Sequence, residues 1–91
     1  MTSILKWLKL LADPTRVRIL RILRKEKLSV AEIQNVLGMG QSRISSHLAQ
    51  LKSSGLLKDE RFGKNIYYEI IEPNDSEKET LNKIFAVIDS A

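Results

Sequence analysis

The sequence predicts an α+β fold that is mostly helical and forms a single domain. Apolar residues recur at helical spacing between residues 2 and 54 and alternate with polar residues between 56 and 71. Helical spacing then returns between 76 and 90. A chain of 91 residues that is 43% hydrophobic and 29% charged has the size and composition of one globular domain, residues 1–91. This length excludes an enzyme with a separate substrate domain.

The first two helices are expected at residues 2–12 and 14–25. Asp13-Pro14 separates them, because the residue before a proline disfavours the helical conformation. The same pair starts the second helix, with Asp13 as N-cap and Pro14 in the first position. The apolar stripe of the first helix consists of Ile4, Leu5, Leu8 and Leu11, and it is widened by Trp7 and Leu10.

The next two helices are predicted at residues 29–37 and 41–54. Ser29 and Glu32 have the spacing of a capping box, in which each side chain satisfies a free backbone N–H group. The glycines of Gly38-Met39-Gly40 indicate a tight turn with at least one positive φ. Gly55 is expected as the C-cap of the fourth helix. Residues 29–54 therefore form a predicted helix-turn-helix.

A β-hairpin is predicted after the fourth helix. The runs 56–62 and 65–71 flank Gly63-Lys64, which is typical of two strands joined by a short turn. A second capping-box pattern begins at Ser76, and a last helix is expected over 76–90. A hairpin that follows a helix-turn-helix completes a winged helix-turn-helix, with residues 56–71 as the wing.

The second helix of such a unit is held so that its first residues enter the major groove of DNA. Each base pair displays a distinct hydrogen-bonding pattern there, so polar side chains are needed to read it. Arg43 is suited to guanine and Gln41 to adenine. The stretch between Gln34 and Lys58 contains no acidic residue, which favours contact with an anion. The predicted contacts are Gln41, Ser42, Arg43, Ser45, Ser46 and His47.

The charge distribution favours the same interpretation. Residues 1–55 contain ten Lys or Arg and three Asp or Glu, whereas residues 56–91 contain five and eight. This asymmetry indicates a surface that faces a polyanion, although a solvated basic helix face has the same composition. The predicted wing contacts are Arg61, Lys64 and Asn65. Arg16 and Arg18 either contact phosphate or are only exposed on the surface of the second helix. Double-stranded DNA is the expected partner.

Five stretches of the chain match a known family in order and spacing. They are Leu11–Leu20, Leu28–Ile33, Gln41–Lys52, Ser54–Leu57 and Gly63–Tyr68. In these stretches the chain resembles the ArsR/SmtB family of winged-helix transcriptional repressors. The resemblance implies a homodimer that binds a palindromic operator, with the first and last helices (residues 1–12 and 76–90) as the dimer interface.

The wide apolar stripes on both terminal helices agree with this implication, because a chain of this size has little surface to cover them. The same side chains could instead pack into the core of a single chain. We expect some of them to serve the core and others the dimer interface. The candidate interface residues are Ile4, Leu5, Trp7, Leu8, Leu11, Leu81, Ile84, Phe85 and Ile88.

The chain departs from the metal-sensing members of the family. They carry Cys-Val-Cys on the third helix, where this chain has Ser29-Val30-Ala31, and the last helix here has no His. With no Cys and one His, no metal site and no cofactor are expected, so the effector is organic, a protein or absent. His47 is the group expected to titrate near neutral pH, and we hypothesise that DNA binding weakens modestly as pH rises. An unchanged pH dependence in His47→Gln would contradict this.

Two alternative functions remain open. Residues 38–45 resemble a subset of the family in which a similar module precedes an S-adenosylmethionine-dependent methyltransferase domain, so the chain is alternatively a regulatory or dimerisation module of such an enzyme. An RNA- or protein-binding winged helix is the second alternative, with Tyr67 and Tyr68 available for stacking.

The chain itself is not expected to be an enzyme, because it contains neither a catalytic triad nor a phosphate-binding loop. No apolar run reaches the ~18–20 residues of a membrane span and no signal peptide is visible, so the expected location is the cytoplasm.

Overall fold

The computed structural model describes residues 2–71 and 75–90, with side chains for residues 5–71 and 78–90. The side chain of Ile4 and the predicted cap at Ser76 lie outside the described residues. The α+β fold is confirmed. The elements in chain order are α1 (Thr2–Leu10), α2 (Pro14–Leu23), β1 (Leu28–Ser29), α3 (Val30–Leu37), α4 (Gln41–Ser53), β2 (Leu57–Phe62), β3 (Asn65–Ile70) and α5 (Asp75–Ser90).

Two helices, α2 and α3, begin where capping side chains satisfy their first backbone groups. The carboxylate of Asp13 accepts hydrogen bonds from the amides of Thr15 and Arg16 at 2.8 and 3.2 Å. The hydroxyl of Ser29 accepts from the amide of Glu32, and the Glu32 carboxylate accepts from the amide of Ser29. The predicted N-caps Asp13 and Ser29 are therefore confirmed.

The ends of α3 and α4 use glycine in different ways. Gly38 is the C-cap of α3 and has a left-handed φ of 66°. The predicted C-cap of α4 was wrong by one residue. Ser54 occupies that position, and Gly55 follows it with a φ of 87°. The left-handed residue is Gly55, because that conformation disfavours residues with a Cβ atom.

The sheet has three antiparallel strands in the order β1-β3-β2. The hairpin of β2 and β3 is confirmed, with Phe62 opposite Asn65 next to a two-residue turn. β1 was not predicted. Its two residues pair with Tyr68 and Tyr67 of β3, so a segment from the first third of the chain fastens the base of the wing.

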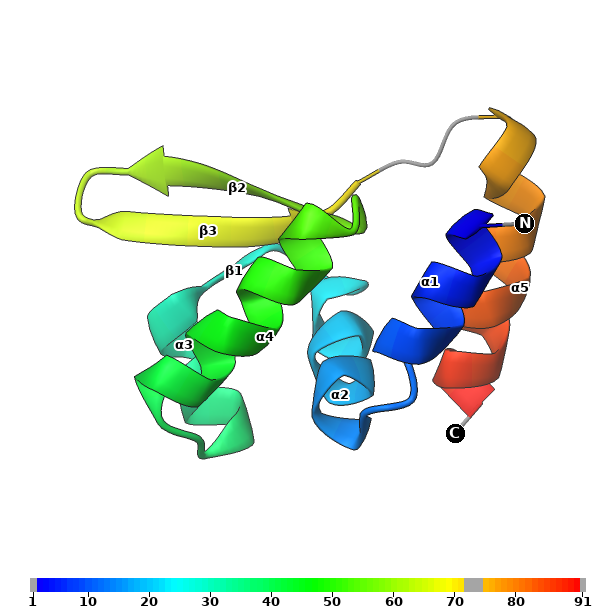
Figure 1. Ribbon diagram of the computed structural model, residues 1–91. Coiled ribbons are helices and arrows are strands. Elements are labelled where there is room, and N and C mark those ends of the chain that lie inside the picture. The colour runs from blue at the N-terminus through cyan, green and yellow to red at the C-terminus, as the bar shows by residue number, and fades with distance from the viewer. Residues whose placement is uncertain (1, 72–74, 91) are drawn as a thin grey trace.

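The core lies between α2, α3, α4 and the base of the sheet. Its fully buried side chains are Ile19, Leu20, Ile33, Ile44, Leu48, Leu51, Leu56 and Leu57. Trp7 of α1 and Phe85 of α5 join the same cluster. In Figure 1 α1 and α5 occupy one end of the molecule and the tip of the wing the other. Since α4 packs on α2, α3 and β2, its opposite face is left to solvent.

Candidate nucleic-acid interface

The exposed face of α4 contains most of the side chains predicted to contact DNA. Ile44, Leu48 and Leu51 are buried on the inner face, and their helical spacing directs the intervening residues outward. The exposed residues are Gln41, Ser42, Arg43, Ser45 and Ser46. The structure therefore brings five of the six predicted residues together on one solvent-facing surface of α4.

The start of α4 has no side-chain cap. Its N-cap is Gly40, which has no side chain to accept from the first backbone N–H groups of the helix. Those groups and the helix dipole give this end partial positive charge, which favours a phosphate. The exposed side chains of Ser42 and Arg43 lie in the same first turn and add donors there.

His47 differs from its neighbours on α4. It is half-buried, and its Nδ1 atom is shielded from solvent with no hydrogen-bond partner among the described residues. Its imidazole lies close enough to Asp13 to help lower the pKa of that carboxyl group, an effect dominated by the hydrogen bond from the Arg16 amide.

The two arginines predicted as candidates for phosphate contacts on α2 have different surroundings. The guanidinium of Arg16 donates from Nε to the carbonyl oxygen of Leu10 at 2.7 Å and from Nη1 to the side chain of Gln50 at 2.6 Å. It therefore connects α1, α2 and α4. Arg18 is exposed, and it lines a groove on another side of α2.

The tip of the wing exposes all three predicted side chains, Arg61, Lys64 and Asn65. Gly63 has a φ of 61°, which allows the tight turn between the strands. In Figure 1 the hairpin extends well past α3 and α4, so these groups are presented away from the core.

An aromatic cluster at the wing was missed by sequence reasoning. Phe62 and Tyr67 meet edge to face with ring centroids 5.8 Å apart, and the ammonium of Lys27 lies 5.2 Å from the centre of the Phe62 ring. These contacts connect the wing to the segment before β1. The only signal in the sequence was an aromatic residue beside the turn, which does not identify its partners.

Two ion pairs hold the base of the wing. Lys52 at the end of α4 lies 3.0 Å from Asp59 of β2, and Lys58 lies 3.4 Å from Glu69 across the hairpin. The hydrogen bond with Asp59 raises the pKa of Lys52, while burial raises the pKa of Tyr68 nearby. Lys52 is thus charged and already paired with a carboxylate, whereas Arg61 and Lys64 at the wing tip have no ion pair within the described residues.

No three His, Cys, Asp or Glu side chains come together as a metal site within the described part of the chain. Among the described helices, none combines the length and the apolar character needed to span a membrane.

The residues that form α2, α3, α4 and the start of β2 also match a family model. Residues 13–59 match the model described as "Bacterial regulatory protein, arsR family". The chain belongs to the ArsR family. The resemblance predicted from the sequence is thereby confirmed, and the family is one of regulatory proteins rather than enzymes.

Similar proteins support both the family and the fold. The arsenic resistance transcriptional regulator ArsR1 of Pseudomonas putida is 46% identical over 63 residues, which are 68% of this chain and 49% of that relative. This ArsR-family chain thus spans about half the length of that relative.

Among solved structures, HlyU of Vibrio cholerae superposes with a TM-score of 0.79 at 27% identity, covering 94% of this chain and 91% of that one. The homodimeric winged helix-turn-helix DNA-binding domain Mb0332 of Mycobacterium bovis superposes with a TM-score of 0.77 at 28% identity. The match covers 98% of this chain and 80% of that one. The winged helix-turn-helix fold is therefore shown.

The residues predicted for a dimer interface fall into two groups. Within one chain the core already buries Trp7, Leu81, Phe85 and Ile88, while Leu11 and Ile84 are partly buried against it. Leu5 and Leu8 of α1 are 65% and 53% exposed. Val87 of α5, which sequence reasoning did not select, is 69% exposed. Each terminal helix thus packs one side against the core and leaves apolar side chains on its other side exposed to solvent.

Proposed function

We propose that this ArsR-family protein is a homodimeric transcriptional repressor that binds double-stranded DNA at an inverted-repeat operator in the cytoplasm. The observation that carries the proposal is the start of α4, which lacks a side-chain cap and exposes the polar side chains of Gln41, Ser42 and Arg43 to solvent. Of the groups on this surface, an arginine can bond bidentately to guanine and a glutamine to adenine.

The roles of the other residues follow from their positions. Ser45 and Ser46 lie one turn further along α4 and contact phosphate or base edges, and His47 lies at the border of this surface. Arg61, Lys64 and Asn65 of the wing contact the neighbouring backbone or minor groove, which fixes register without reading sequence. Arg18 contributes at most a peripheral phosphate contact.

Dimerisation through α1 and α5 is supported by the apolar side chains that one chain leaves uncovered. Leu5, Leu8 and Val87 are each more than half exposed. Apolar surface of this kind on terminal helices favours a protein–protein contact. The structural neighbour Mb0332, a DNA-binding domain of the same fold, is homodimeric.

A two-fold dimer predicts the form of the operator. Two recognition helices that enter successive major grooves lie about 34–36 Å apart, so the half-sites are separated by roughly one helical turn. The effector that controls binding is not a metal in this proposal, because the chain has no Cys and a single His.

The test is affinity selection of random duplex DNA by the purified protein, followed by titration of the selected duplex at two salt concentrations. Recovery of an inverted repeat whose affinity falls steeply with salt supports the proposal, because each neutralised phosphate releases counterions. Failure to enrich any sequence, or binding that does not require a duplex, would contradict it and favour a regulatory or protein-binding module.

A further inference from the structure

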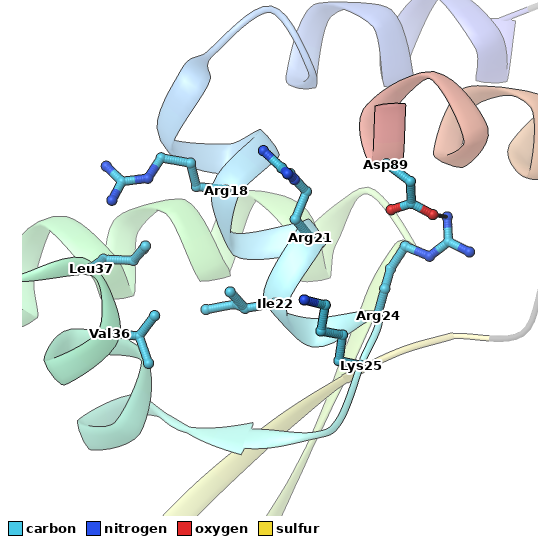
Figure 2. A pocket seen from close by; sticks show the side chains of 8 residues that line it. All are labelled: Arg18, Arg21, Ile22, Arg24, Lys25, Val36, Leu37 and Asp89. Carbon is cyan, nitrogen blue, oxygen red and sulfur yellow. Dashed lines mark ion pairs between the residues drawn. The ribbon is translucent and has the colours of Figure 1, made fainter. Parts of the chain in front are cut away.

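A groove of about 490 Å³ lies between α2, α3 and the C-terminal end of α5, and Arg18 is the only candidate DNA contact among its lining residues. Figure 2 shows the side chains that line it. Ile22 of α2 and Val36 and Leu37 of α3 form an apolar side. Arg24 and Asp89 meet at the opposite side.

The groove has an excess of positive charge. Four of its eight lining residues are cationic, namely Arg18, Arg21, Arg24 and Lys25, and Asp89 is the one carboxylate. The Nη1 atom of Arg24 lies 2.9 Å from Oδ2 of Asp89. Within the described part of the chain, no carboxylate pairs with Arg18, Arg21 or Lys25. Positive charge thus remains beside an apolar wall after the internal pair is formed.

We propose that this groove binds a small organic carboxylate with an apolar body, such as an aromatic acid, as the effector of the protein. The apolar body would lie on Ile22, Val36 and Leu37, and the carboxylate would bond to the cations of α2 and of the two residues that follow it. Ligand sites commonly combine such an apolar wall with a few polar groups that fix orientation. The Arg24–Asp89 pair already shows a carboxylate held at this position.

A small ligand fits these observations better than the backbone of DNA does. Val36, an apolar side chain, is 58% exposed in the groove wall. A small acid can cover the apolar wall and present a single carboxylate to the cations, whereas the charged phosphates of a duplex backbone would leave that wall uncovered.

The same groove offers a route to regulation, which rests on the proposed function. Arg24 also lies over the ring of Phe85, with its guanidinium carbon 4.6 Å from the ring centre. Arg24 thus fastens α2 to α5 through both Asp89 and Phe85. A ligand carboxylate competes with Asp89 for the cations and changes how α5, one of the proposed dimer helices, is held against the α2–α4 body.

Binding is tested without DNA, so that its failure is distinguishable from failure of the DNA-binding proposal. The full 91-residue chain, labelled with ¹⁵N, is titrated with benzoate, with its neutral analogue benzamide and with inorganic phosphate. Benzoate is expected to shift the amide signals of Ile22, Val36 and Leu37 with a saturable, millimolar profile. Benzamide and phosphate are expected to have little effect on these signals.

Charge variants assign the binding to the groove. Arg21→Gln combined with Lys25→Gln is expected to weaken benzoate binding about tenfold, because the ligand loses two charged donors. Asp89→Asn is expected to strengthen it several-fold, because the competing carboxylate is removed while the side chain keeps its size. Lys83→Gln, which lies on α5 but outside the groove, is the matched control and is expected to bind as the unmodified protein does.

Several results would overturn the proposal. One is the absence of saturable shifts with benzoate and 3-phenylpropionate up to about 10 mM. A second is an equal response to inorganic phosphate, which would indicate a nonspecific anion surface. A third is a weaker affinity in Asp89→Asn. A fourth is a shift of the same three amides by duplex DNA, which would assign the groove to the nucleic-acid interface.

Discussion

The guanidinium of Arg16 donates a hydrogen bond to the side-chain oxygen of Gln50 at 2.6 Å, from α2 to the second half of α4. Its Nε atom donates at the same time to the carbonyl oxygen of Leu10, at the end of α1. One side chain thus joins α4, the helix proposed to contact DNA, to α1, a helix proposed for dimerisation. A residue considered for phosphate contact is therefore placed to support the geometry of the interface.

We expect Arg16→Ala to lower the free energy of unfolding by about 1–2 kcal/mol, because two hydrogen bonds are lost. The dependence of DNA affinity on salt concentration should stay the same if Arg16 makes no phosphate contact. Urea unfolding and DNA titration at several salt concentrations measure these two quantities. Gln50→Ala should lower stability by a smaller amount in the same direction. A decrease of about 1 in the salt slope of Arg16→Ala would instead indicate a phosphate contact.

Arg43→Ala is expected to cost about 1–3 kcal/mol of affinity for the selected operator and to relax specificity at one base position. The side chain is exposed in the first turn of α4, so its removal should leave the fold intact. Affinities for the operator, for single-base variants of it and for random duplex measure the effect. Lys83→Ala on α5 is the control. An equal loss of affinity on operator and random DNA would identify Arg43 as a phosphate contact.

Leu8→Glu is expected to convert the dimer to a folded monomer. Leu8 is 53% exposed in one chain, so the glutamate is tolerated in the monomer but would be desolvated in a dimer interface. Sedimentation velocity measures the oligomeric state, and circular dichroism reports the fold. Ala49→Glu, at an exposed apolar residue outside the terminal helices and outside the groove, should remain dimeric. A Leu8→Glu protein that stays dimeric would exclude this face of α1 from the interface.

The N-cap of α2 predicts a specific loss of stability in acid. The amide of Arg16, and then that of Thr15, lowers the pKa of Asp13 in the folded state below its ordinary value of 3.8, against an opposing effect of burial. A group whose pKa is lowered by folding stabilises the protein above its unfolded pKa, and this contribution disappears as pH falls through the folded pKa.

We therefore compare the free energies of unfolding of the unmodified protein and of Asp13→Asn. The difference in favour of the unmodified protein is expected to be constant above about pH 5 and to shrink below about pH 4. Asparagine is a suitable control, because it retains an N-cap acceptor but does not titrate. Urea unfolding at a series of pH values provides the measurement. A constant difference between the two proteins down to pH 2 would contradict a role for the Asp13 charge.

Local signals predicted the fold well. Asp13-Pro14, the Ser29 and Glu32 pair and Gly63 each specify a cap or turn through neighbouring atoms, so the sequence alone locates them. β1 escaped prediction because two residues carry no detectable period, and its pairing with Tyr67 and Tyr68 depends on tertiary structure.

The candidate site was predictable to the extent that it depends on the helix period. Once Ile44, Leu48 and Leu51 define the inner face of α4, the exposed positions follow. The contacts of Arg16 and His47 depend on how α1 and α2 pack against α4. The apolar period within one helix does not predict that packing. The separation of Phe85 from Leu8, one in the core and one exposed, depends on packing in the same way.

The pairing of Leu28 with Tyr68 has a consequence for the order of folding. During synthesis, the helix-turn-helix can form its local contacts as soon as residues 29–54 have emerged. β1 has no partner until the far strand of the hairpin is made, and closing that long loop carries an entropic cost. β1 is thus the last strand of the sheet to be paired, so a nascent chain can form α4 before the base of the wing is fixed to the helices.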